Sequence, residues 1–210
     1  MPLFANARTF LEAVYTRYRA LDSYSDSGLS RSRGTRHPRL CAFETKFQRP
    51  HFLRFAFESP HPYRKRRHLV SRCIVSHDGT YAYLYASHYS SSSTLEQQES
   101  LDMALAGATG ISSGTAHTIG ALLFSDVSGF NMLHLKRPRF RRSRVVEGVP
   151  CTCVSGLHPR GGRFTAWFGT EDLLLRRLYR SRFNSEELRF SPQANPSIPR
   201  EAFHAPRSAT

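Results

Sequence analysis

The chain has 210 residues, with 30 Lys and Arg against 16 Asp and Glu, which gives a formal net charge of +14. Its 40% hydrophobic and 12% aromatic content is too apolar for a disordered chain, and its length suits one domain with a single core. No apolar run reaches the roughly 18–20 residues of a membrane-spanning helix, so the sequence predicts no such helix.

The amino-terminal segment predicts a helix over residues 3–21. Its apolar residues recur at three- and four-residue steps and form one stripe, namely Phe4, Ala7, Phe10, Leu11, Val14, Tyr18 and Leu21. The first eight residues have neither the basic region nor the apolar stretch of a signal peptide. They leave two explanations open, a cytoplasmic protein or an exported one whose leader is missing from this sequence.

Residues 22–86 predict a first block of antiparallel strands. Apolar and polar residues alternate in 40–48 and again in 53–58, which is typical of half-buried strands. A third strand is expected over 69–76. Asp78 and Gly79 then favour a tight hairpin turn before a returning strand at 81–85.

The middle of the chain predicts a surface loop and then helices. Residues 87–94 are rich in Ser, which favours a loop. Thr94 and Gln97 have the spacing of a capping box, so we expect a helix from there through Ala106. A linker of small residues, 107–114, precedes a second expected helix, and the helical insertion as a whole spans 95–124.

Alternating patterns resume in residues 140–190 and predict a second block of strands. Gly148 and Pro150 suggest a bulge or a sheet edge there. The tail, 191–210, is expected to be extended. The simplest architecture is one α+β domain over 1–210, in which a helical insertion separates two antiparallel blocks of one sheet.

One motif raises a catalytic alternative. Residues 110–114 fit G-x-S-x-G, the strand-to-helix turn that exposes the nucleophile of serine hydrolases, with Ser112 as the candidate. Asp126 and His134 follow in the expected order. The preceding segment looks helical, however, and the alternation of strands and helices that this fold needs is missing. We therefore expect no enzyme, no catalytic residue and no cofactor, and keep a hydrolase as the third alternative.

The cysteines leave their pairing open. Four cysteines in this length are sparse for a disulfide scaffold, and the C-x-C spacing of Cys151 and Cys153 is unusual for zinc. On a strand these two would share a face, with His158 nearby. We predict no metal site, and the sequence does not pair Cys41, Cys73, Cys151 and Cys153.

The basic excess consists of 27 Arg and only 3 Lys, much of it in two clusters. Such clusters usually form solvated loops, but they can also bind nucleic acid or an anionic surface. A basic polyanion-binding protein is therefore the main alternative function. The residues expected to face an anionic surface are Arg64, Arg66, Arg67, Arg137, Arg139, Arg141 and Arg142.

An ordered series of motifs resembles the LolA-like lipoprotein carriers. The series begins with Arg49-Pro50-His51-Phe52-Leu53-Arg54-Phe55 and continues through Ser59-Pro60 and Val75-Ser76-His77-Asp78-Gly79-Thr80 to Tyr85. In that family an S-D-G hairpin follows the Pro, and Ser76-His77-Asp78-Gly79 departs from it by one inserted residue. More of the chain resembles a related group of uncharacterised, predicted periplasmic proteins, on Tyr24–Gly28, Ala106–His117, Trp167 with Leu174–Arg177, and Asn195–Phe203.

This resemblance implies a curved, unclosed antiparallel sheet, a half-barrel wrapped around helices, in an exported or periplasmic protein. It also implies a non-enzymatic carrier whose apolar cavity takes an acyl chain or another hydrophobic small molecule. We expect a monomer without a specific nucleic-acid partner. The alternative is that the same aromatic residues simply fill the core. The residues expected to line the cavity are Phe43, Phe47, Leu53, Phe55, Phe57, Leu122, Leu123 and Trp167.

Overall fold

The computed structural model describes residues 4–32, 39–61, 64–66, 69–88, 92–109, 112, 114–127 and 129–204. Its eleven strands form one sheet in the order β6-β5-β4-β3-β2-β1-β11-β10-β9-β8-β7, and every neighbouring pair is antiparallel. β6 and β7 are the two edges, so the sheet is not closed. The predicted α+β fold with an unclosed antiparallel sheet is confirmed.

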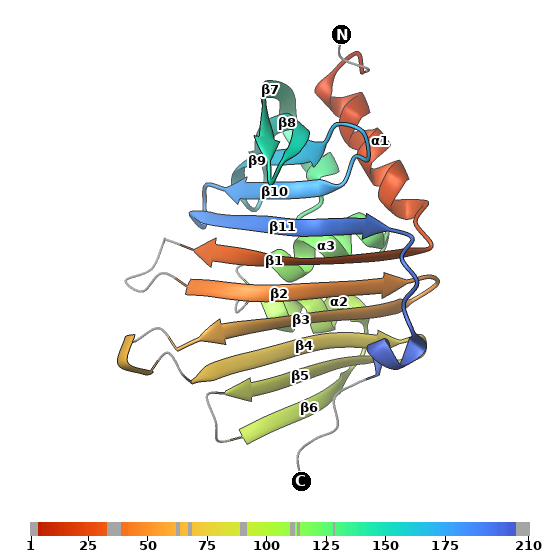
Figure 1. Cartoon of the computed structure of the whole chain (residues 1–210), viewed down its shortest axis with the longest axis vertical. Helices are drawn as coiled ribbons and strands as arrows, with labels where there is room; N and C mark the ends of the chain where they lie inside the picture. Colours follow the sequence, from red (N-terminus) through yellow and green to blue (C-terminus); the bar gives the residue numbers. More distant parts are fainter. Residues whose placement is uncertain are drawn as a thin grey trace.

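The first block contains six strands. The helices α2 and α3 lie against the inner face of the sheet (Figure 1). The bounds of this block are β1 (Ser23–Ser32), β2 (Arg39–Gln48), β3 (Phe52–Pro60), β4 (Val70–Asp78), β5 (Ala82–His88) and β6 (Ser92–Gln98). The second block has the bounds β7 (Lys136–Val146), β8 (Val149–His158), β9 (Gly162–Gly169), β10 (Leu175–Arg180) and β11 (Ser185–Ala194). The last strand, β11, pairs with the first, β1, so the two blocks join through the ends of the chain.

The helices have the bounds α1 (Ala7–Arg19), α2 (Leu101–Thr109) and α3 (Thr115–Leu123), with short 3-10 turns at η1 (Arg64–Arg66), η2 (Met132–His134) and η3 (Arg200–Phe203). The predicted first helix is confirmed, and it begins at Ala7 because the side chain of Asn6 accepts hydrogen bonds from the backbone N–H groups of Arg8 and Thr9. Within the part of the chain that is described, no helix is long and apolar enough to cross a membrane.

The predicted Asp78–Gly79 hairpin is confirmed. Asp78 Oδ1 accepts hydrogen bonds from the N–H groups of Thr80 and Tyr81, each at 2.9 Å. Gly79 has a φ of 100°, a conformation that favours glycine at a turn.

The predicted start of the helical insertion was wrong. Thr94 and Gln97 lie on β6, where they pair with Ala86 and Tyr83 of β5. Residues 87–94 are accordingly not one loop, since β5 extends to His88 and β6 begins at Ser92. The helix begins later, where Ser100 Oγ accepts a hydrogen bond from the N–H of Met103. Strand pairing along β5 outweighs the local capping pattern.

The second block also differs in detail from its prediction. It begins at Lys136 rather than 140, and β11 continues to Ala194, into the expected extended tail. Gly148 lies in the β7–β8 hairpin turn, where both it and Glu147 have positive φ. The bulges are instead in β7, between Lys136 and Arg139 and between Arg141 and Arg144. The sequence analysis expected either a bulge or a sheet edge near Gly148 and Pro150, and β7 is an edge strand of the sheet.

Candidate functional site

Seven of the eight residues expected to line a cavity meet in one apolar cluster on the inner face of the sheet, the face that the helices cover. Strand alternation directs the side chains of β2 and β3 towards α3, and rings such as Phe47 and Phe124 pack edge to face with centroids 5.2 Å apart. All seven are at most 5% exposed, namely Phe43, Phe47, Leu53, Phe55, Phe57, Leu122 and Leu123. The structure brings them together, and their contact with a ligand stays a prediction.

Trp167 was placed wrongly. On β9 the side chains of Phe164 and Phe168 face inwards, so alternation turns Trp167 to the outer face. There it packs with Cys151 and Cys153, and the guanidinium of Arg177 lies 4.9 Å from its ring centroid. Phe164 and Phe168 of the same strand share the inner face, where we expected the side chain of Trp167.

The inner face also holds four buried charges, which the sequence analysis missed. Asp26 on β1, Glu187 and Arg189 on β11, and Arg180 on β10 all have fully buried side chains. Arg189 Nη1 lies 2.5 Å from Asp26 Oδ2, and Arg189 Nη2 lies 3.0 Å from Glu187 Oε1. Arg180 Nη2 lies 3.0 Å from Glu187 Oε2. We call these four residues the buried ion cluster.

The buried ion cluster is anchored to neighbouring elements. Arg180 Nη1 donates to Thr118 Oγ1 of α3 at 2.7 Å, and Tyr24 Oη donates to Asp26 Oδ2 at 2.5 Å. Burial, and then the charge of Asp26, raises the pKa of Tyr24 well above its usual value. Burial alone would lower the pKa of Arg189, but Asp26 and Glu187 together raise it well above its usual value. Both groups therefore keep their protons at neutral pH.

Asp26 Oδ1 of this cluster and Thr45 Oγ1 beside it are among the buried polar atoms that have no hydrogen-bond partner within the described residues. Asp26 and Thr45 are cross-strand neighbours on β1 and β2, and Thr45 is fully buried. A buried polar atom without a partner costs free energy, so this position favours a molecule that hydrogen-bonds to it.

The catalytic alternative lacks its structural context. Ser112 follows the helix α2 rather than a strand, and it is 1% exposed. Its Oγ donates to the carbonyl of Thr109 at 3.4 Å and accepts from the N–H of Ala116 at 3.3 Å. Asp126 and His134 are both exposed. Ser112 therefore serves the connection between α2 and α3, where a buried hydroxyl holds the start of the second helix.

Cys151 and Cys153 share the outer face, as expected for a strand. All four cysteines are buried. Burial raises the pKa of Cys153 to about 11, so its thiol is protonated at neutral pH. Among the described residues, no three His, Cys, Asp or Glu side chains are grouped so that they could hold a metal ion.

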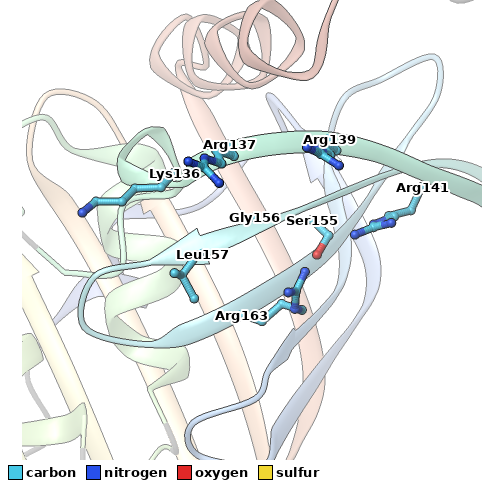
Figure 2. Close-up of a pocket in the computed structure, with 8 residues that line it drawn as sticks. All are labelled: Lys136, Arg137, Arg139, Arg141, Ser155, Gly156, Leu157 and Arg163. Atoms are coloured by element: carbon cyan, nitrogen blue, oxygen red, sulfur yellow. The ribbon is translucent and has the colours of Figure 1, made fainter.

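The second basic cluster of the sequence forms a groove of about 430 Å³ on the outer side of β7, β8 and β9. Arg137, Arg139 and Arg141 line it, whereas Arg142 does not (Figure 2). Lys136 and Arg163 complete a set of five cations, together with Ser155, Gly156 and Leu157. We call this the basic groove. Arg163 was missed because it lies on β9, far from the cluster in sequence.

The first basic cluster lies elsewhere, in the β3–β4 connection. Arg66 belongs to η1 and is exposed. Arg64 begins η1, but its side chain, like the whole of Arg67, lies outside the described part of the chain. Since β3 and β4 belong to the opposite half of the sheet from β7, the exposed Arg66 lies apart from the basic groove.

No protein-family model matches the chain, and no curated protein matches it. Among solved structures it is similar to LprF from Mycobacterium bovis, with a TM-score of 0.53 and 13% identity over 92% of this chain and 95% of LprF. It is also similar to an uncharacterized conserved protein from Thermus thermophilus, with a TM-score of 0.50 and 8% identity over 96% of this chain and 94% of that one. At these identities the two similarities show a shared fold.

The solved structures similar to this chain also include a LolA superfamily protein from Nitrosomonas europaea. It aligns over 96% of this chain and 99% of its own, with a TM-score of 0.36 and 9% identity. The fold assignment rests on the two preceding similarities and on the strand order itself.

Proposed function

We propose that this chain is a non-enzymatic binding protein that holds an apolar molecule, an acyl chain or a lipid, between the inner face of its sheet and its helices. In this proposal the protein works outside the cytoplasm, as a periplasmic or otherwise exported carrier. The LolA-like motifs and the unclosed sheet support this assignment.

The observation that carries the proposal is the position of α3. Eight of its nine residues are buried, all except His117. The helix contacts both α1 and α2 and lies over the inner face (Figure 1). Because a helix with its side chains is about 10 Å wide, a shift of α3 by part of its width would open room for a hydrocarbon chain.

The chemistry of the interior suits such a ligand. Its lining is aromatic and aliphatic, and each buried methylene of a bound chain contributes about 0.8 kcal/mol. Asp26 Oδ1 and Thr45 Oγ1 offer free hydrogen-bonding capacity within this apolar layer. A hydroxyl or amide of the ligand could bind there while its chain lies against Phe43 and Phe55, whose ring centroids are 5.9 Å apart.

The first experiment is native mass spectrometry of the protein purified without detergent from an exporting host, followed by lipid extraction. We expect an added mass that dissociates on activation and is recovered in the organic phase as an acyl-containing molecule. A bare protein that also fails to take up a dansyl-labelled fatty acid would end the carrier proposal and leave the fold untouched.

A pair of variants locates the bound molecule. Ala108 on α2 is fully buried, whereas Ala106 on the same helix is exposed. Ala108→Leu adds the same atoms to the interior that Ala106→Leu adds to the surface. We expect the first variant to weaken uptake of the labelled fatty acid and the second to leave it unchanged, with thermal unfolding confirming that both fold. Equal uptake by both variants would place the ligand elsewhere.

A further inference from the structure

We infer that the basic groove is a second binding site, which takes the phosphate groups of anionic lipid headgroups at a membrane surface. The groove is on the outer side of the sheet, whereas the proposed apolar ligand lies on the inner side, so this inference goes beyond the proposed function.

The backbone of β7 is shaped so that its cations face the groove. A bulge interrupts its pairing with β8 between Lys136 and Arg139. Within the bulge Arg137 has a φ of 48°, which is uncommon for any residue but glycine. Bulges re-aim side chains, and Figure 2 shows Arg137 and Arg139 on the groove side of the ribbon.

Gly156 on β8 allows the start of β7 to lie close to β8. A Cβ atom at that position would lie 3.0 Å from Leu135 Cβ and 3.2 Å from the carbonyl oxygen of Lys136. Glycine therefore lets β7 lie close over β8, so that cations of β7 share one groove with Arg163 of β9.

The charges of the groove have no internal compensation. None of its five cations lies within 4.0 Å of a carboxylate on the described residues, although other arginines of the chain do. Five like charges around one hollow repel one another, and a bound anion relieves that repulsion. Arg guanidinium groups match phosphate oxygens in a two-pronged geometry, which favours phosphate as this anion.

An exposed apolar side chain favours a lipid source for the phosphate. Leu157 lines the groove beside its cations and is 53% exposed. Apolar side chains beside cations suit the boundary between headgroups and acyl chains. Nucleic acid fits less well, because none of the lining residues is aromatic and Phe140 of β7 packs inwards on Phe10, leaving no ring in the groove for a base to stack on.

The test is co-sedimentation with vesicles of phosphatidylcholine alone and with vesicles in which part of it is replaced by phosphatidylglycerol. The groove variant carries Arg139→Gln, Arg141→Gln and Arg163→Gln. We expect it to lose at least about tenfold in affinity for the anionic vesicles, because each basic residue near such a surface contributes about 1 kcal/mol, roughly fivefold. All three side chains are exposed, so the fold should persist.

The matched control removes the same net charge from exposed positions that neither line the groove nor belong to the basic clusters, with Arg19→Gln, Arg31→Gln and Arg200→Gln. It should keep most of the affinity. An equal loss in the control would reduce the effect to net charge and overturn the site.

Two further outcomes would also overturn the inference. One is vesicle binding that the groove variant leaves unchanged while it abolishes uptake of inorganic phosphate. The other is unchanged vesicle binding with a loss of affinity for a single-stranded oligonucleotide. Neither depends on an interior ligand, so failure here is distinguishable from failure of the carrier proposal.

Discussion

The buried ion cluster shows how four charges can occupy the inner face of an apolar sheet. Asp26 and Glu187 carry two negative charges, and Arg180 and Arg189 carry two positive ones, so the formal charges cancel. Each guanidinium bridges neighbouring strands. Such a cluster is costly to assemble in a dry interior and much more costly to break, because one removed partner leaves a buried charge uncompensated.

Replacing Arg189 by Met should therefore be among the most damaging changes in the chain. Arg189→Met leaves Asp26 without its counter-charge and Glu187 Oε1 without its cation. We expect it to lower the free energy of unfolding by about 3–5 kcal/mol. Urea unfolding followed by circular dichroism measures this loss.

Arg177→Met is the control for this prediction. Arg177 pairs with Glu186 on the outer face, where both side chains are partly exposed. Arg177→Met should lower the free energy of unfolding by about 1 kcal/mol or less. Equal losses in the two variants would show that burial does not decide the strength of these ion pairs.

The same cluster explains why the inward face of β11 does not follow from apolar alternation. Leu188 and Phe190 are the apolar residues of that segment, and apolar alternation alone would turn them inwards. In the structure Glu187 and Arg189 face inwards, while Leu188 packs with the outer cluster around Trp167. The alternation rule fails here because the inward charges neutralise one another across strands, which no single strand reveals.

At the scale of elements, the sequence predicted strands well where apolar residues alternate and poorly where they do not. β2 and β3 follow their pattern, whereas the polar edge strand β6 carries no such pattern and is defined by its pairing with β5. Of the five cations of the basic groove, Arg137, Arg139 and Arg141 were expected to face an anionic surface, whereas Lys136 and Arg163 were not. The meeting of the β7 cations with Arg163 depends on the bulged course of that strand, which residue spacing does not encode.

Two glycines in different elements should respond oppositely to alanine. At Gly28 on β1, a Cβ would lie 2.1 Å from the carbonyl oxygen of Leu188 and 2.3 Å from Phe43 Cζ. We expect Gly28→Ala to cost about 1–3 kcal/mol through overpacking. At Gly107 on α2, the added atom meets only the end of the Leu84 side chain, at 2.8 Å.

Gly107→Ala should accordingly be neutral or stabilise the protein by up to about 1 kcal/mol, the gain in helix propensity. Thermal unfolding of both variants checks the pair. A similar loss in both would mean that the space around Gly107 is as rigid as that around Gly28.

The α2–α3 pair should make the stability sensitive to acid. His117 of α3 hydrogen-bonds with Thr109 of α2, at 2.5 Å between Nδ1 and Oγ1. Burial lowers the pKa of His117, and burial likewise lowers the pKa of His77 and of His158. The unfolded chain, with His pKa values near 6.5, therefore binds more protons than the folded one as the pH falls below that value.

The free energy of unfolding should thus be highest above about pH 6.5 and decline from there towards pH 5. Above pH 5 most carboxyl groups stay ionised, so the histidines dominate this interval. His117→Gln should flatten the decline in urea unfolding measured across it, and the exposed His204 supplies the control variant His204→Gln. An undiminished decline in His117→Gln would remove this residue from the explanation.

At the scale of the whole molecule, the β1–β11 pairing turns two predicted blocks into one continuous sheet. The two blocks were predictable from their strand patterns. Their junction was not, because Ser and charged residues dominate β1 and the partner strand lies about 160 residues away, as in the hydrogen bond between Arg189 and Asp26. Only the assembled fold shows that they meet.

This junction predicts that both blocks unfold together. Trp167 is the only tryptophan and belongs to the second block, so its fluorescence reports that block, whereas far-ultraviolet circular dichroism reports the whole sheet. We expect the two urea transitions to coincide, as for a two-state domain. An earlier fluorescence transition would show that the second block opens by itself.

The central place of β11 also dictates an order of events during synthesis. The amino-terminal strands emerge from the ribosome first, but β1 cannot acquire its second neighbour until residues 185–194 have been made. Until then the nascent chain presents β1 as an unpaired strand edge, the kind of surface on which other chains aggregate. The finished sheet therefore forms only after residues 185–194 have been made, and a chain truncated before Ser185 would keep that edge open permanently.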